Sequence, residues 1–201
     1  DRSVSRGLGD VYKRQFIEHL IKITSNKNNG IEHDSKDLIY SLWKDRPSVK
    51  TKSIFKLKKE FVGCTVAKKH QDLSKSLKSK FIIITSPDSI CWLLNIRGYD
   101  LENSPLVMSR LIATKKKLYV FIDLKKVPKK LIKNDKLVCF ISSSEFDIHL
   151  QKLNKKDSIY LDSNVSYFYY NLLKSRKNKL TIGEDPCKLM KARKNNSEIK
   201  Y

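Results

Sequence analysis

The chain has 201 residues, of which 40% are hydrophobic, enough to build a core and to exclude wholesale disorder. Six glycines and four cysteines exclude a collagen-like chain and a disulfide-rich scaffold. Apolar runs such as residues 81–84 are only a few residues long, so we expect no membrane span and no membrane partner.

The net charge is strongly positive, +21 from 42 basic and 21 acidic residues. Only eight of the basic residues are Arg, whereas bidentate recognition of phosphates and base edges relies mostly on Arg. A composition rich in Lys, Asn and Ile is typical of an AT-rich genome, and we expect a bacterial source and no nucleic-acid partner. Binding of DNA or RNA with a steep salt dependence would overturn that expectation.

The first fifteen residues do not resemble native protein. Residues 5–15 resemble one translated frame of the transposase adaptor used to build sequencing libraries, with DVYKRQ at 10–15 as the matching core. We therefore expect residues 1–15 to be an adaptor-derived segment, with native residues missing upstream of Phe16.

Residues 16–63 contain two predicted helices and a predicted linker. Apolar residues at helical spacing indicate a helix over 16–23, and Ser35 can cap a second helix that ends before Pro47. The segment 48–63 is rich in lysine and has few strong patterns, so we predict a linker there.

A better-defined unit begins at residue 64. Thr65 can cap a helix that reaches Leu77, residues 80–85 form a continuous apolar strand, and Pro87 lies in the first turn of the next helix. A polar loop is predicted at 95–105.

Further strands are predicted at 106–114, 118–123, 137–141, 158–161 and 180–182, with helices over 146–153 and 165–173. Strands that alternate with helices of about ten residues predict an α/β domain with a mixed sheet. At the other end, residues 194–201 predict a helix that starts where the chain stops, so we expect an internal fragment of a larger protein.

The sequence contains no catalytic or metal-binding motif. The four Cys lack CxxC spacing and the four His lack HExxH spacing. The turn after the strand at 80–85 has no glycine that would let a dinucleotide approach. The aromatic run at 167–170 has a helical pattern, which favours core packing over base stacking. We therefore predict no catalytic residue, no metal ligand and no cofactor bound by this chain.

One polar loop, residues 95–100, is the candidate functional site. It contains Asn95, Arg97, Gly98 and Asp100 between strongly apolar elements. The alternative is a structural turn in which Gly98 supplies a positive φ and Arg97 pairs with Asp100.

This loop also carries a family resemblance. Residues 86–100, SPDSICWLLNIRGYD, resemble the second non-catalytic domain of the three-domain Xaa-Pro aminopeptidases, which are relatives of prolidase and creatinase. Further similar stretches follow the family order: LWKDRP at 42–47, FID at 121–123, DPC at 185–187 and KARKN at 191–195, then Glu198. Cys91 and Tyr99 depart from the small residue and the Ser that are usual at these positions.

The resemblance implies a creatinase/prolidase N-terminal-domain-like mixed sheet flanked by helices at 64–188. It implies that 16–47 is the end of a similar first domain, that 48–63 links the two, and that 189–201 enters a catalytic domain. It further implies a cytoplasmic parent enzyme that removes the N-terminal residue from peptides with proline in second place.

In this family the catalytic domain holds two divalent metals, manganese or zinc, through two Asp, one His and two Glu, none of which is carried by this chain. We therefore expect the chain itself to be inactive. Its implied partners are its own C-terminal catalytic domain, the peptide substrates of the parent and, in a homodimer, a second parent chain. The loop at 95–100 would face the cleft. Two alternatives are a stand-alone interaction module or pseudoenzyme of the same family, and a lysine-rich nucleic-acid binder.

Overall fold

A six-stranded mixed sheet forms the centre of the protein in the computed structural model, which describes residues 13–25, 42–45, 52–133 and 135–200. The strand order is β6-β5-β4-β2-β7-β8. The strands are β2 (Phe81–Ile84), β4 (Arg110–Ala113), β5 (Leu118–Ile122), β6 (Val138–Ser142), β7 (Ser158–Asp162) and β8 (Lys179–Gly183). Only β4 runs against its neighbours β2 and β5, and the other pairs are parallel. The predicted α/β class and mixed sheet are confirmed.

The continuous apolar run at 81–84 becomes the interior strand β2, which pairs with β4 on one side and β7 on the other. A strand that is covered on both faces needs apolar side chains at successive positions, as this run provides. The lysine turn at 115–117 joins β4 to β5 as predicted, although β4 begins at Arg110 rather than at 106.

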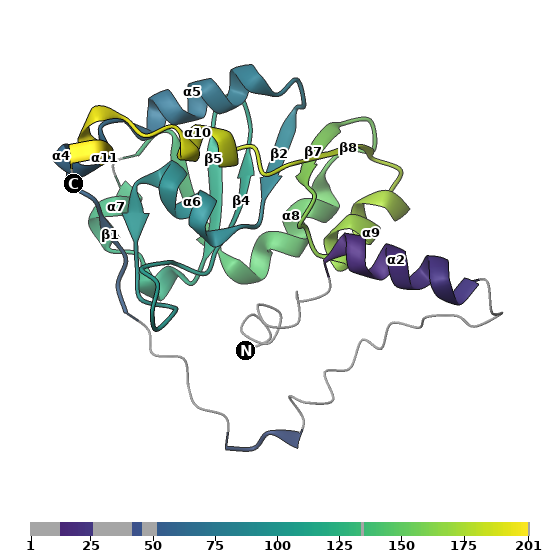
Figure 1. The fold of residues 1–201 in the computed structure, drawn as a ribbon. Helices are drawn as coiled ribbons and strands as arrows, with labels where there is room; N and C mark the ends of the chain where they lie inside the picture. The colour runs from purple at the N-terminus through teal and green to yellow at the C-terminus, as the bar shows by residue number, and fades with distance from the viewer. Residues whose placement is uncertain (1–12, 26–41, 46–51, 134, 201) are drawn as a thin grey trace.

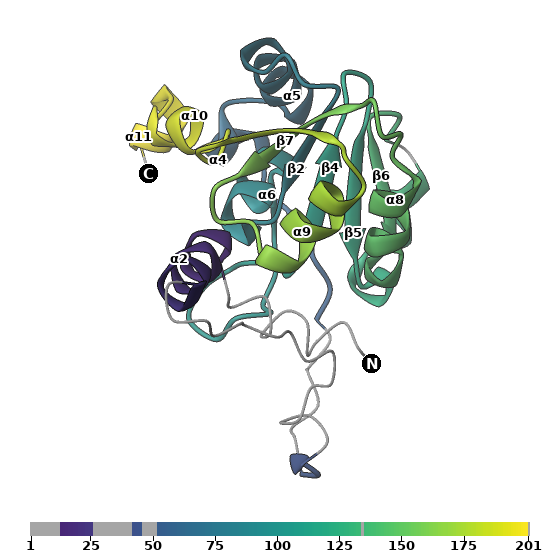
Figure 2. The ribbon, with the colours of Figure 1, turned by 90° about the vertical axis from the view of Figure 1, so that its right-hand side faces the viewer.

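Helices cover both faces of the sheet, so the protein has three layers (Figure 1; Figure 2). One core cluster lies under α5 (Val66–Ser76), α6 (Pro87–Leu94), α7 (Lys129–Lys133) and α10 (Lys188–Ala192). The second cluster lies under α8 (Phe146–Lys152) and α9 (Tyr167–Ser175) on the other face. Among the helices of the described segments, none combines the length and hydrophobicity that a bilayer crossing requires.

A linker is predicted over 48–63, but its described part, 52–63, contains a strand and a helix. There β1 (Phe55–Lys56) pairs antiparallel with β3 (Ile96–Arg97), and α4 (Lys59–Val62) follows. Ile54 is 2% exposed and belongs to the main core cluster. The segment is therefore packed onto the domain, and backbone hydrogen bonds fasten it there: the Ile54 N–H donates to the Lys126 carbonyl at 2.9 Å and the Leu57 N–H to the Asn95 carbonyl at 2.9 Å. The domain boundaries themselves remain a prediction.

The N-terminal helix α2 (Arg14–Ser25) contains the predicted helix 16–23 and packs against α9. It begins inside the segment expected to derive from an adaptor, and the guanidinium of Arg14 lies 5.5 Å from the ring centre of Tyr170. The adaptor origin of residues 1–15 remains a prediction. The helix predicted after Ser35 lies almost entirely outside the described residues.

The last helix lies against α4, and the helix before it lies against α6. After α10, the helix α11 (Asn196–Lys200) forms at the predicted place, and Asn195 donates a hydrogen bond from Nδ2 to the Val62 carbonyl at 3.1 Å. Two short 3₁₀ turns, Leu124–Lys126 and Ser143–Glu145, complete the described elements. The helix α11 is thus close to α4 (Figure 1).

Candidate functional site

The candidate loop starts at the C-terminal end of α6, where Asn95 ends the helix in the left-handed conformation at φ 54°. Asn adopts this region more readily than most residues, so it is suited to this position. Its N–H donates to the Trp92 carbonyl at 3.3 Å. The chain then turns into β3 instead of continuing as an irregular loop.

Asn95 is buried and its side chain joins two helices. Its Oδ1 accepts a hydrogen bond from Lys69 Nζ at 2.7 Å, and its Nδ2 donates to the Cys64 carbonyl at 2.9 Å. Asn95 therefore connects α6 to the start of α5, and this is a structural role.

Lys69 is the least expected member of this network, because it is only 3% exposed. Besides Asn95, its ammonium donates to the Trp92 carbonyl at 2.7 Å and lies 4.1 Å from the Trp92 ring centre. Burial lowers the pKa of Lys69 to about 8, against a smaller opposite effect of the nearby Cys64 thiol.

Arg97 is held by the backbone of its own loop. Its Nη1 donates to the carbonyls of Ile96 at 2.8 Å and of Cys91 at 3.2 Å. The expected pairing of Arg97 with Asp100 is wrong, since the carboxylate of Asp100 has other partners. Asp100 Oδ1 accepts from Lys126 Nζ at 2.8 Å, and Oδ2 accepts the Met108 N–H at 2.7 Å.

The expectation that Gly98 supplies a positive φ is also wrong: within the described residues the one glycine with positive φ is Gly63. Glycine is needed at 98 for space. A Cβ there would lie 2.6 Å from Cγ2 of the buried Val107. The loop thus folds back closely on residues 105–107, and the Gly98 N–H donates to the Pro105 carbonyl at 3.3 Å.

The outer surface of the same loop is apolar. Exposed side chains gather there, with Phe55 and Tyr99 in ring contact at 5.7 Å between centres. The exposed fractions are 39% for Phe55, 55% for Tyr99, 42% for Leu101 and 39% for Met108. We call these four residues the loop face. A rigid polar network therefore supports an exposed apolar surface.

Metal-binding side chains do not cluster in the described residues. No group of three or more His, Cys, Asp or Glu side chains in them could hold a metal ion. Burial raises the pKa of the Cys91 and Cys187 thiols, which keeps both in the unreactive protonated form. His70 is buried with Nε2 2.6 Å from the Thr114 carbonyl, as a packed residue on the apolar face of α5.

The sequence did not indicate the cationic partners of Asn95 and Asp100, which are Lys69 and Lys126. Lys69 and Lys126 are 3% and 6% exposed, although Lys is rarely buried. Lys69 lies on the apolar face of α5 between Val66 and Leu73. That position was the one feature of the sequence that could have indicated its burial.

Comparison with known proteins identifies the fold independently. The family model of the creatinase/prolidase N-terminal domain matches residues 45–198. The Xaa-Pro aminopeptidase of Drosophila melanogaster is 31% identical over 175 residues, which cover 81% of this chain and 28% of that protein. The Xaa-Pro aminopeptidase 1 of Dictyostelium discoideum is 26% identical over 208 residues, covering 98% of this chain and 32% of that protein.

A solved structure has the same fold. The crystal structure of the X-prolyl aminopeptidase of Caenorhabditis elegans, described as a cytosolic enzyme with a di-nuclear active site, superposes with a TM-score of 0.87 at 23% identity. The match covers 94% of this chain and 32% of that one. The expectation of a bacterial source has no support from these relatives, which are an insect, an amoeba and a nematode.

This chain spans less than a third of the length of these three relatives. The similarity lies in their N-terminal, non-catalytic part. The family model covers most of the chain, and the sheet and its helices agree with it. The chain belongs to the creatinase/prolidase N-terminal domain family.

Proposed function

We propose that this chain is the non-catalytic N-terminal portion of a metal-dependent Xaa-Pro aminopeptidase, an enzyme that removes the N-terminal residue from peptides with proline in second place. The observation that carries the proposal is the family match over residues 45–198 combined with relatives that bear this activity in their names. The chain matches only the N-terminal portion of each.

The chemistry of such an enzyme belongs to a catalytic domain that follows this chain. Two divalent metals, manganese or zinc, would be held there and would activate water against the scissile carbonyl. The described residues offer no cluster that fits such ions, so the proposal gives them no role in holding metal. The C. elegans neighbour, described as cytosolic with a di-nuclear active site, supports both the metal dependence and a cytoplasmic location.

Within the whole enzyme, the proposed role of the chain is to shape the mouth of the catalytic cleft. The loop face would pack on the catalytic domain, because exposed apolar side chains of this size favour a protein interface. The network of Asn95, Arg97, Gly98 and Asp100 would keep the loop face in a fixed position behind that contact.

The test compares the chain with the full-length protein in an assay of Xaa-Pro peptide hydrolysis with added manganese or zinc. The chain alone should release no N-terminal residue, and the full-length protein should release it at rates that chelation abolishes. Metal-dependent hydrolysis by the chain alone would contradict the proposal.

The role of the loop face is tested in the full-length protein by Tyr99→Ser/Leu101→Ser, with Ile132→Ser as the control. Ile132 is 46% exposed on α7, so its replacement removes a similar exposed apolar side chain elsewhere. The loop-face variant should raise KM or lower kcat several-fold, and the control should leave both unchanged. Equal effects of the two variants on KM and kcat would contradict the proposed role of the loop face at the cleft.

A further inference from the structure

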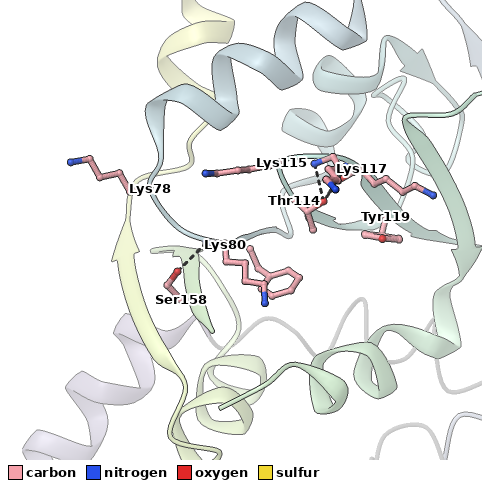
Figure 3. Close-up of a pocket in the computed structure, with 9 residues that line it drawn as sticks. Lys78, Lys80, Thr114, Lys115, Lys117, Tyr119 and Ser158 are labelled. Atoms are coloured by element: carbon pink, nitrogen blue, oxygen red, sulfur yellow. Dashed lines mark hydrogen bonds between the residues drawn. The ribbon is translucent and has the colours of Figure 1, made fainter. Parts of the chain in front are cut away.

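A hollow of about 470 Å³ lies at the end of the sheet far from the loop face, beside the β4–β5 turn (Figure 3). Three segments distant in the sequence line it: residues 78–81 at the start of β2, the turn at 114–117 with Tyr119 on β5, and Ser158 at the start of β7. Its volume is in the range of pockets that hold small molecules.

The charge around this hollow is one-sided. Five of its nine lining residues are lysines and none is acidic: Lys78, Lys80, Lys115, Lys116 and Lys117. In the described segments, the one carboxylate paired with these lysines is Asp157, whose Oδ1 lies 2.6 Å from Lys80 Nζ. Like charges gathered on a small area repel one another, and a bound anion would relieve that repulsion.

The turn that carries three of the lysines is held rigidly. Thr114 Oγ1 accepts the N–H groups of Lys116 at 3.3 Å and Lys117 at 3.0 Å, while the Thr114 N–H donates to the Lys117 carbonyl at 2.9 Å. The Thr114 carbonyl contacts His70 Nε2 at 2.6 Å, which ties the turn to α5. The lysine backbones are therefore fixed in place before any ligand arrives.

The remaining lining residues supply hydroxyls and ring surfaces. Ser158 Oγ accepts the Lys80 N–H at 3.0 Å, so its own proton remains a donor. The half-buried rings of Phe81 and Tyr119 provide apolar wall. In Figure 3 Lys78 points away from the other lysines, and the long rotatable stem of a lysine lets its ammonium turn toward an anion.

We propose that this hollow binds a small ligand that carries two or more phosphate groups. Lysine ammoniums bind phosphate as point charges, and five of them on two segments suit several phosphates better than one carboxylate. The rings of Phe81 and Tyr119 give a planar group attached to the phosphates an apolar wall to pack on. The site lies apart from the loop face, so it does not depend on the function proposed above.

The test is calorimetric titration of the 201-residue chain with inorganic tripolyphosphate and with ATP at about 100 mM salt. Both should bind with one site per chain. Lys115→Gln/Lys117→Gln should weaken both by about tenfold or more, because it removes two of the five ammoniums that attract the phosphates. Lys115→Arg/Lys117→Arg should retain binding.

The matched control is Lys129→Gln/Lys130→Gln, which removes two adjacent exposed lysines from α7. It should leave both affinities within about twofold, and circular dichroism should show each variant folded. Absence of tripolyphosphate binding, or equal weakening by the two double Gln variants, would overturn the proposal. Tighter binding of single-stranded RNA that tripolyphosphate does not displace would also overturn it.

Discussion

Lys69 is a buried cation whose partners are neutral: two carbonyl-type oxygens and the Trp92 ring. By contrast, Lys126 and Asp100 are a buried ion pair with side chains 8% and 3% exposed. A buried charge without an opposite charge favours its neutral form, whereas a pair is stabilised by its own attraction. Lys69 should therefore make a contribution to stability that depends on pH.

The first prediction concerns the pH dependence of stability. The pKa of Lys69 is about 8 in the folded protein and near 10.5 in the unfolded chain. Between these values the unfolded chain binds more protons, so the free energy of unfolding should rise as pH increases from about 8 to 10.5. Urea unfolding across this range measures that rise.

Lys69→Met is the control, because it removes the titrating group and keeps an unbranched stem of similar size. The rise with pH should be clearly smaller in this variant than in the original chain. An identical rise in both proteins would show that Lys69 titrates normally.

The second prediction concerns Asp162, which is fully buried at the end of β7. Burial raises the pKa of this carboxyl, and the charge of Asp185 raises it further. Its Oδ1 accepts the Asn164 N–H at 2.6 Å, and its Oδ2 accepts from the Thr85 hydroxyl at 3.5 Å. Asp162→Asn keeps an acceptor for Asn164 and removes the buried charge, so its Tm at pH 7 should equal or exceed that of the original chain.

The raised pKa of Asp162 also predicts how the stability of the protein changes at acidic pH. A carboxyl whose folded pKa is raised binds its proton more readily in the folded protein, so its contribution to stability increases as pH falls toward about 4. Asp162→Asn should lack this contribution. A loss of stability at pH 7 by more than about 2 kcal/mol would indicate that the charge is needed.

Among the elements, α5 and α6 provide a matched pair of helix starts. Thr65 caps α5, since its side chain accepts the Lys68 N–H at 3.2 Å. Ser86 occupies the same position in α6 without a side-chain cap bond. Thr65→Ala should therefore cost about 1 kcal/mol of stability, and Ser86→Ala only a few tenths. Chemical denaturation measures the free energy of unfolding of both variants. Equal losses would contradict the conclusion that Thr65 caps its helix through its side chain and Ser86 does not.

The close approach of Gly98, the residue after β3, to residues 105–107 gives a fourth prediction. Gly98→Ala would place its Cβ 2.6 Å from a stiff, fully buried Val107 side chain, which should cost about 1–3 kcal/mol. In the double variant Gly98→Ala/Val107→Ala the cost should be clearly less than the sum of the single costs. If the two single costs simply add, the contact between a Cβ at position 98 and Val107 is not the source of the strain.

Element by element, the sequence predicted the strands of the six-stranded sheet well, because each has a run of apolar residues, and it predicted α5, α6, α8 and α9 from their apolar stripes. It failed for β1, β3, α4, α7 and α10, which are two to five residues long and too short to show periodicity. For the candidate loop, whose role in the cleft stays a prediction, the sequence did not give the contacts of Arg97 and Asp100. The partner of Asp100 is Lys126, which lies 26 residues away and becomes a neighbour only in the folded chain.

On the scale of the whole molecule, two surfaces of different character lie at separate places on one three-layer domain. The loop face is apolar and rests on a fixed polar network next to the β1–β3 pair. The lysine-lined hollow lies by the β4–β5 turn and is strongly basic. The chain spans less than a third of its matched relatives, and the proposed catalytic domain would pack on the first surface and leave the second free.

The most direct test of this account is long-read sequencing of the source transcript through both ends of the coding region. We predict an open frame that continues past Tyr201 and encodes two Asp, one His and two Glu in the order of the Xaa-Pro aminopeptidases. Native codons should also replace residues 1–15. A stop codon soon after position 201 would contradict the account and would leave a stand-alone module of the same family.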